Sequence, residues 1–454
     1  MSAIITSKFR LENALNFKNA VADSANSYYI FLGKSDTWSS VITSTTDAVA
    51  DIPRDCLVDE NDAWQNMSSL KRLTSADVIS IVPRYNWVSG NSYFPWDDGD
   101  VDIFTKAFYV ITDEFKVYKC IKAGSGVAST KPIHTSVDPL LGADGYTWKY
   151  MTTIASIEQK FLTTGYIPIV TVPNGTGDNA SRYNYQQDSL ANAGKIYRIA
   201  VDVPGVGYDT APTVIITGSG TGATATAVIS GGAVTAINVT APGTGYSVVN
   251  VTLTGGTPET AATARAILSP KNGHGTDPVE ELGGFFVGLS TRLTANEGSN
   301  DFIVDNSFRQ IGIVKNPKVY GGGSVATATT LSALNKIQFS ATATAFSVPG
   351  YITGQTSGAR AFTDSYNAVT GLLNYHQNDK TGYTAFQYNE TVTGSSAGSG
   401  TIGASSFVLS GITTSGLIAP ETQRFSGSIS FLENRAPINR AASQIEDIKM
   451  IVEF

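Results

Sequence analysis

Cysteines and long apolar stretches are scarce in this sequence, and each absence excludes a class of protein. The 454 residues include two cysteines, Cys56 and Cys120, whereas a secreted disulfide scaffold would carry more. We therefore expect two buried free thiols in a protein made in the cytosol. No apolar stretch reaches the roughly 18–20 residues that span a bilayer. The start, MSAIITSKFR, has no long apolar core after a basic region, as a secretory signal would. We expect no membrane partner.

Runs of positive charge are also absent. The net charge is −7 at pH 7, and the 31 lysines and arginines form no stripe. A nucleic-acid-binding surface needs such a stripe to neutralise phosphates, so we expect no nucleic-acid partner. Charged residues make up 15% of the chain and glycine is abundant, with 44 residues, which is typical of turn-rich β proteins. The chain is too long for one core, so we expect two to four domains that need no metal for stability.

The segment 424–454 is predicted to contribute two strands to a core sheet. Ile429 and Phe431 alternate with serines in the first strand. Ile448, Met450 and Val452 share one face of the second strand. We expect this closing strand to pack against the segment after the N-terminal helix or against 306–316, because a free apolar end would fray.

Polar residues interrupt the first of these strands. Glu433, Asn434 and Arg435 break the alternation, and Pro437 lacks a backbone donor, so we expect that no central strand passes through it. Arg309 also lies in apolar, β-forming surroundings. Burying such charged groups is costly unless they are paired. We therefore predict structural salt bridges or subunit contacts for Arg309, Glu433, Asn434 and Arg435.

The other elements predicted from periodicity are mostly strands. Trp148 and Tyr150 are two positions apart and share a face of one strand, which we assign to a sandwich core in preference to a carbohydrate platform. The elements expected are a helix over 6–22, a strand over 27–33, a short helix over 62–73, an extended segment over 81–87, a hairpin over 107–124 that turns at Thr112 and Asp113, and a strand over 144–151.

Two segments of the chain contain internal repeats. KIYRIAVDVPGVGY (195–208) matches AVTAINVTAPGTGY (233–246) at a period of about 38 residues, with Ile199 over Ile237. Two copies are too few for a solenoid, so we expect one small β module that turns at glycines. In a second segment FSVPGYITGQTSGA (346–359) matches FQYNETVTGSSAGS (386–399) at a spacing of 40 residues.

No catalytic or metal-binding constellation is predicted. The acidic run 97–102 lacks the spacing of a calcium loop, so we favour an exposed Asp-Gly turn. His274 is far in sequence from the other histidines and has no metal-site motif beside it. Glu280 and Glu281 would point to opposite faces of a strand, which makes them a poor glycosidase pair. We expect no cofactor and no enzymatic activity.

The order of several segments resembles a known family. These segments are TSKFR…LNF near the start, YVITDEFKVYKC (109–120), DGYTWKY (144–150), NGHGTDPVEELGGFFVGLSTRL (272–293), NSFRQIGIVKNP (306–317) and FSGSISFLENRAPI (425–438). Together they are similar to the gene product eight family, the baseplate wedge proteins of T-even-type phages with contractile tails. The resemblance covers about 1–190, 271–320 and 421–454, and the repeat-bearing segments interrupt it as two insertions.

This resemblance implies a structural subunit of the virion, in the tail baseplate. Such a protein would assemble in the host cytoplasm, form a homodimer, link neighbouring baseplate wedge proteins and relay the triggering of sheath contraction. The alternative is a tail protein that binds or depolymerises a host-surface glycan through its tyrosine-rich repeats. We expect a mainly β fold, a multidomain antiparallel β-sandwich scaffold with a few short helices. The expected domains are a discontinuous scaffold (1–85, 271–320 and 421–454), a second β domain (86–194) and inserted repeat modules at 195–270 and 321–420.

Overall fold

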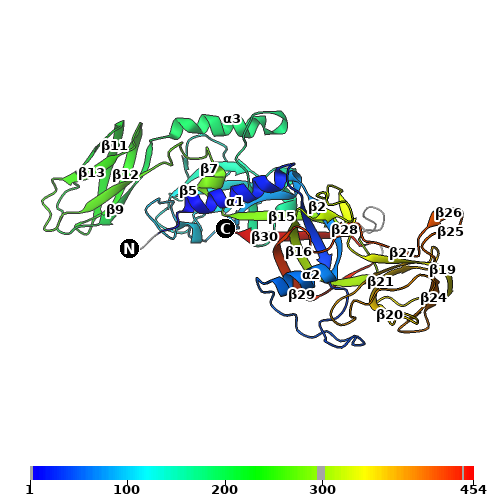
Figure 1. Ribbon diagram of the computed structural model, residues 1–454. Coiled ribbons are helices and arrows are strands. Elements are labelled where there is room, and N and C mark those ends of the chain that lie inside the picture. Colours follow the sequence, from blue (N-terminus) through cyan, green and yellow to red (C-terminus); the bar gives the residue numbers. More distant parts are fainter. Residues whose placement is uncertain (1–3, 294–301, 442–443) are drawn as a thin grey trace. The chain divides into compact units, whose positions relative to one another are not determined.

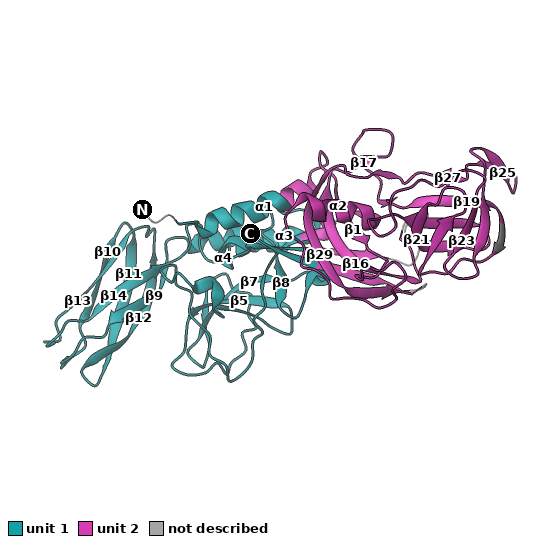
Figure 2. Ribbon diagram, turned by 60° about the horizontal axis from the view of Figure 1, so that its bottom comes forward, with its two compact units in different colours: residues 1–17, 79–289, 450–454 teal, residues 18–78, 290–449 magenta. Residues whose placement is uncertain are grey.

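The computed structural model describes residues 4–293, 302–441 and 444–454. The fold is mainly β, with antiparallel sheets and a few short helices (Figure 1), which confirms the predicted fold class. The chain divides into two compact units, coloured separately in Figure 2. Unit 1 consists of 1–17, 79–289 and 450–454, and unit 2 of 18–78 and 290–449. Within the described ranges no helix has both the length and the apolar character needed to cross a bilayer.

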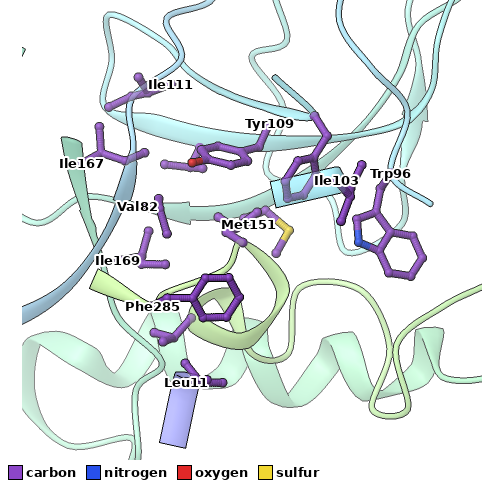
Figure 3. Close-up of a cluster of buried hydrophobic side chains, with 14 of the residues drawn as sticks. Leu11, Val82, Trp96, Ile103, Tyr109, Ile111, Met151, Ile167, Ile169 and Phe285 are labelled. Atoms are coloured by element: carbon purple, nitrogen blue, oxygen red, sulfur yellow. The ribbon is translucent and has the colours of Figure 1, made fainter. Parts of the chain in front are cut away.

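The first helix, α1 (Ser7–Ala22), forms where the apolar spacing predicted it. Leu11 packs into the core of unit 1 with Val82, Ile167 and Phe285 (Figure 3). Two four-stranded sheets surround this core. In spatial order they are β30 (Glu446–Glu453), β15 (Phe286–Leu293), β3 (Val78–Pro83) and β8 (Tyr166–Ile169), and β4 (Tyr109–Ile111), β5 (Lys116–Lys122), β7 (Thr147–Thr153) and β6 (Leu140–Leu141). The helices α3 (Ala180–Ser189) and α4 (Pro278–Glu281) complete this part of unit 1.

The closing strand β30 has the predicted alternation but a different partner. Ile448 and Met450 are buried, while Asp447, Lys449 and Ile451 are exposed. The neighbour of β30 is β15, so the prediction that it packs against the segment after α1 or against 306–316 is wrong. The physical reason is that side-chain periodicity identifies the buried face of a strand but says nothing about its hydrogen-bonded neighbour.

The first repeat forms one module with a shared core. Ile199 and Ile237, equivalent in the two copies, lie directly opposite each other, and both are buried. The last strand of each copy pairs with the first strand of the other. Neither copy therefore completes a sheet alone. The module consists of a sheet in the order β11 (Thr221–Ser230), β12 (Ala233–Thr244), β9 (Ile196–Val203) and β14 (Thr263–Leu268), and of the pair β10 (Thr213–Gly218) and β13 (Val249–Thr254).

Unit 2 is built on a five-stranded antiparallel sheet. Its order is β18 (Thr330–Ser332), β2 (Met67–Leu73), β1 (Tyr28–Gly33), β16 (Asn306–Lys315) and β29 (Ser428–Arg440), and the helix α2 (Leu57–Asn66) leads into β2. The predicted helix over 62–73 is therefore wrong beyond Asn66. Met67, Leu70 and Leu73 recur at a spacing that also fits a helix, but β2 lies between β1 and β18, which use its backbone donors and acceptors.

The strand β29 runs through Pro437 at the edge of its sheet, so the prediction that no central strand passes through this proline is confirmed, whereas the interruption predicted at Glu433, Asn434 and Arg435 is absent. This strand lies at the edge of the sheet, where a missing donor leaves no neighbour unpaired. Its register with β16 also shifts there: Phe308 pairs with Ile438, whereas Gln310 pairs with Asn434. The bulge accommodates the residues around Pro437, since bulges leave residues outside the ladder.

The second repeat segment forms a seven-stranded sheet. Ile352 and Val392, equivalent in its two copies, are both fully buried in its core. The strand β22 also pairs with β19, which closes six strands into a ring. The order is β22 (Leu372–His376), β21 (Arg360–Asn367), β20 (Gly350–Gly354), β23 (Thr391–Gly394), β24 (Ser399–Ile402), β19 (Asn335–Thr344) and β27 (Leu417–Ile418), with the small pairs β17 (Lys318–Val319) with β28 (Thr422–Gln423) and β25 (Phe407–Leu409) with β26 (Ile412–Thr414) nearby in sequence.

The two cysteines are free thiols, as predicted, but they differ in burial. Cys120 is buried in β5, whereas Cys56 precedes α2 and is half-buried. The expectation that both are buried is therefore wrong for Cys56. Burial raises the pKa of the Cys120 thiol well above its ordinary value, which keeps it protonated and unreactive.

Candidate functional site

Arg309 and Asn434, which the sequence singled out, lie close together in unit 2. The Arg309 guanidinium is buried and makes two hydrogen bonds to the carboxylate of Asp47, at 2.7 and 2.8 Å, and one to the Ser35 carbonyl. Asn434 sits on the neighbouring strand, opposite Gln310. Arg309 therefore holds the segment around Asp47 against β16.

Glu433 and Arg435, the other two residues, lie on the outer strand β29. Their side chains form a salt bridge of 3.1 Å and are both nearly half exposed. The backbone carbonyl of Arg435 accepts a hydrogen bond from the Trp38 indole. The structure thus places Arg309 inside unit 2, and the charged groups of Glu433 and Arg435 on its surface.

A pocket of about 770 Å³ opens beside Asn434, wholly within unit 2. We call it the acceptor pocket, because acceptor groups predominate among its polar walls: the carboxylates of Asp51, Asp59, Asp62 and Asp379, and the side-chain amides of Gln65, Gln310, Asn61 and Asn434. Lys34 and Arg54 are its cationic wall residues. Trp38, Ile52, Val58 and Leu432 supply an apolar wall.

A buried network of charged side chains reaches one wall of the pocket. Lys34, which follows β1, adopts a positive φ of 60°, a conformation that is costly for a residue with a side chain. Its ammonium group lies 3.1 Å from the Asp36 carboxylate. The ammonium group of Lys380, which lies 344 positions later in the sequence, donates to the same carboxylate oxygen of Asp36. We call Lys34, Asp36, Asp364, His376 and Lys380 the unit 2 cluster.

His376 is the centre of the unit 2 cluster. Its Nδ1 lies 2.8 Å from Asp364 and its Nε2 lies 3.3 Å from Asp36, and all three side chains are fully buried. Burial alone lowers the pKa of His376, but the two carboxylates outweigh burial and raise that pKa to about 9. His376 is therefore a charged imidazolium at neutral pH that donates from both ring nitrogens.

Amide side chains connect the unit 2 cluster to the acceptor pocket. Asn378 donates to Asp36 and to Asn66, which in turn donates to the Asp62 carboxylate at 2.7 Å. The other Asp62 oxygen accepts from Gln310 at 3.1 Å. Movement at the pocket wall is therefore coupled by direct hydrogen bonds to the buried charges.

A second buried cluster lies in unit 1. Lys119 forms a salt bridge with Glu281, and both side chains are buried. The Glu281 carboxylate also accepts from the Gly275 backbone amide at 2.6 Å. Lys149 is fully buried and contacts Tyr185, Ser189 and the Val137 carbonyl. We call Lys119, Lys149, His274 and Glu281 the unit 1 cluster.

His274 in this cluster is neutral at physiological pH. Its Nδ1 lies 3.7 Å from Glu281, too far for a hydrogen bond, and its ring packs edge-on against Trp96. Burial and the neighbouring Lys119 lower the pKa of His274 to about 3. Burial raises the pKa of Glu281, but Lys119 and His274 together outweigh burial and the pKa falls to about 2. Burial also lowers the pKa of Lys149, to about 7.

The acidic residues discussed from the sequence have other environments than expected. Asp97 is buried and bound in a bidentate pair by Arg265, with Arg198 2.9 Å away. The exposed turn predicted for 97–102 is therefore wrong for Asp97. Glu281 lies in the helix α4 and not on a strand, so the argument from strand alternation did not apply to it. In both cases the partner is far away in sequence.

The geometry of the unit 2 cluster does not provide an activated nucleophile. Both ring nitrogens of His376 face carboxylates, and the hydroxyl of Ser35 donates to Asp364 instead of to the histidine. A nucleophile activated by a histidine needs a direct contact between the two. Among the described residues no group of three or more His, Cys, Asp or Glu side chains is placed to hold a metal ion.

The tyrosines considered for glycan binding are mostly not available as a surface platform. Tyr375 is in the core of the seven-stranded sheet. Tyr351 and Tyr366 are half-buried, and Tyr383 and Tyr388 are exposed.

Comparison with known proteins shows similarity to one family over part of the chain. Residues 3–140 match the family model described as bacteriophage T4 Gp8. The chain is also 26% identical to the baseplate wedge protein gp8 of Enterobacteria phage T4 over 240 residues, an alignment that covers 43% of this chain and 70% of the phage T4 protein. The family match includes the pocket residues from Lys34 to Gln65, whereas Asp379 and His376 come from outside it. The chain is thus similar to the Gp8 family over residues 3–140 and to a phage T4 baseplate wedge protein over 43% of its length.

Proposed function

We propose that this chain is a non-enzymatic structural subunit of a phage tail baseplate wedge. In this role it links neighbouring wedge proteins and relays the triggering of sheath contraction. The observation that carries the proposal is the similarity to the phage T4 baseplate wedge protein gp8. The protein would assemble in the host cytoplasm and act in the virion.

The two buried clusters support a mechanical role. In each, charged side chains from distant parts of one unit are held by salt bridges and hydrogen bonds. Breaking a buried pair costs several kcal/mol, so such pairs keep a unit rigid while its outer contacts change. A subunit that transmits a contraction signal through its contacts needs this rigidity.

A map of the whole phage particle in its extended and contracted states tests this function. We expect the chain in the baseplate, in contact with other wedge proteins, with different contacts in the two states. A position outside the baseplate would contradict the structural role. Identical contacts before and after contraction would contradict the relay.

We further propose that the protein is a homodimer, in which Glu433 and Arg435 on the exposed edge of β29 contribute to contacts. Closed twofold contacts are the commonest oligomeric arrangement. Light scattering at micromolar concentration should give twice the chain mass of 47.9 kDa. A monomer throughout that range would contradict the proposal.

The domain division is likewise a proposal: a scaffold of 1–85, 271–320 and 421–454, a second domain of 86–194, and two inserted modules. Replacing 195–270 by a short Gly/Ser linker should leave the scaffold folded, since loop length costs closure entropy only logarithmically. Deletion of 321–420 is the informative contrast, because this segment supplies His376 and Lys380 to Asp36. The first deletion also removes Arg198 and Arg265 from the buried Asp97, so Asp97→Asn accompanies it. We expect this deletion to leave the scaffold folded and the second to destabilise unit 2. Insolubility after the first would contradict the division.

A further inference from the structure

The orientation of one buried amide indicates what the acceptor pocket binds. Gln310 is 1% exposed and lines the pocket. Its Nε2 donates to Asp62 and to the Asn434 oxygen, each at 3.1 Å. A carboxylate only accepts, so the amide nitrogen must face Asp62. Asn434 is fixed in the same way, because its nitrogen donates to the Asp51 carbonyl.

This arrangement leaves the Gln310 oxygen as a buried acceptor without a donor. Within the described part of the chain no hydrogen-bond partner reaches Gln310 Oε1, nor Oε1 of Gln65, which also lines the pocket. Leaving a buried acceptor unpaired costs about 1–3 kcal/mol. Two such acceptors in one pocket therefore point to a ligand that brings N–H donors.

The charges of the pocket point to the same kind of ligand. Lys34 is paired with Asp36, and Arg54 with Asp59. Asp62 is held by amide donors, and Asp379 accepts from the Tyr383 hydroxyl. Among the described residues no cationic side chain forms a salt bridge with Asp51, Asp62 or Asp379. The pocket thus carries uncompensated negative charge.

We propose that the acceptor pocket receives an arginine side chain from a neighbouring protein chain. A guanidinium carries five N–H donors in a planar fork and a positive charge. The donors match the unpaired amide oxygens, and the charge matches the carboxylates that have no cationic partner. Its aliphatic stem would lie against the apolar wall, where Ile52 and Val58 are largely exposed. The pocket volume of about 770 Å³ is far larger than a bare cation needs. This inference rests on the proposed assembly function, since that function supplies the neighbouring chain.

Calorimetric titration of the full-length protein with short blocked peptides tests the pocket directly. The probe is acetyl-Gly-Arg-Gly-Arg-Gly-amide, and the control is the same peptide with citrulline, which keeps the shape but loses the charge. We expect binding of the arginine peptide that weakens as salt increases, and at least tenfold weaker binding of the citrulline peptide. Equal binding of the two peptides, or no binding at low salt, would overturn the proposal.

Matched charge variants localise the effect. Asp379→Asn and Asp62→Asn should each weaken the arginine peptide severalfold, and Gln310→Leu should do so without changing the net charge. Asp98→Asn removes another exposed charge, from unit 1, and should leave the affinity unchanged. Thermal midpoints, measured in parallel, separate loss of binding from loss of fold. We expect Asp379→Asn to affect the fold least of the three variants, because Asp379 is exposed at the surface. If Asp98→Asn weakens binding as much as Asp379→Asn does, the peptide binds nonspecifically and the proposal is wrong.

The particle map separates this inference from the proposed function. A neighbour's arginine in the pocket supports both. A baseplate position with an empty pocket, or with a metal ion there, keeps the function and overturns the inference. A position outside the baseplate overturns the function, and the peptide titration then decides the inference alone.

Discussion

Units 1 and 2 each bury a histidine among charged side chains, yet at neutral pH one histidine is neutral and the other is positively charged. His274 lies beside the cations of unit 1, and burial together with Lys119 lowers its pKa to about 3. His376 lies between two carboxylates, which against burial raise its pKa to about 9. Burial is common to both, so the sign of the neighbouring charge decides the protonation state.

The comparison predicts opposite pH dependence in the two units. In unit 1 the lowered pKa values of His274 and Lys149 mean that the unfolded state binds more protons, so stability rises with pH. In unit 2 the raised pKa of His376 means that the folded state holds a proton longer, so stability falls as pH rises from 6.5 to about 9.

The largest expected effect is the acid response of unit 1. His274 has a pKa of about 3 in the folded state against 6.5 in the unfolded state. The free energy of unfolding of unit 1 should therefore fall by on the order of 5 kcal/mol as pH decreases through this window. Segment-resolved hydrogen exchange at pH 7 and pH 4, corrected for intrinsic rates, should show unit 1 weakened. His274→Gln should flatten this dependence. An unchanged pH dependence in that variant would refute the assignment.

Breaking the salt bridge between Lys119 and Glu281 should reduce the stability of unit 1 slightly less than acid does. Glu281→Gln leaves the fully buried Lys119 without its counter-charge, and we expect a loss of about 3–5 kcal/mol in urea unfolding at pH 7. Replacing both partners, Glu281→Leu with Lys119→Met, should recover much of it, because no unpaired charge remains. If the double variant is as unstable as the single one, the pair does not account for the loss.

The alkaline response of unit 2 is the next smaller effect. Raising pH from 6.5 to 9 should remove on the order of 3 kcal/mol from unit 2 as His376 loses its proton; the lowered pKa of Lys380 acts in the opposite direction. Proton NMR should show His376 charged at pH 7.5 and His274 neutral. Asp364→Asn removes one carboxylate and should lower the His376 midpoint. The same midpoint in this variant would contradict the role of Asp364.

The smallest expected effect on stability comes from an exposed salt bridge. Glu433 and Arg435 are both nearly half exposed, and such pairs contribute little. Glu433→Gln should leave the unfolding midpoint unchanged. A smaller mass in light scattering for this variant would support a subunit contact, whereas a shifted midpoint with an unchanged mass would make the pair structural.

Local pattern accounts for much of the fold. Helical spacing over 6–22 predicted α1, and alternation predicted the buried face of β30, because burial on one face imposes a period on any amphipathic element. The repeat predicted a shared module, and Ile199 and Ile237 indeed face each other. Periodicity failed at Met67, Leu70 and Leu73, because their spacing fits a helix as well as a strand. Pairing with β1 and β18 makes this segment a strand.

Sequence alone determined the type of elements such as α1 and β30, the absence of a positive stripe and the resemblance to a baseplate family, because composition, periodicity and order along the chain are local properties. The charge of His376 and the walls of the acceptor pocket were decided only by tertiary structure. His376 meets an aspartate 340 positions away, and Gln310 meets Asn434 and Asp62 across two strands and a helix. Protonation and unsatisfied hydrogen bonds depend on neighbours in space, which no local pattern specifies.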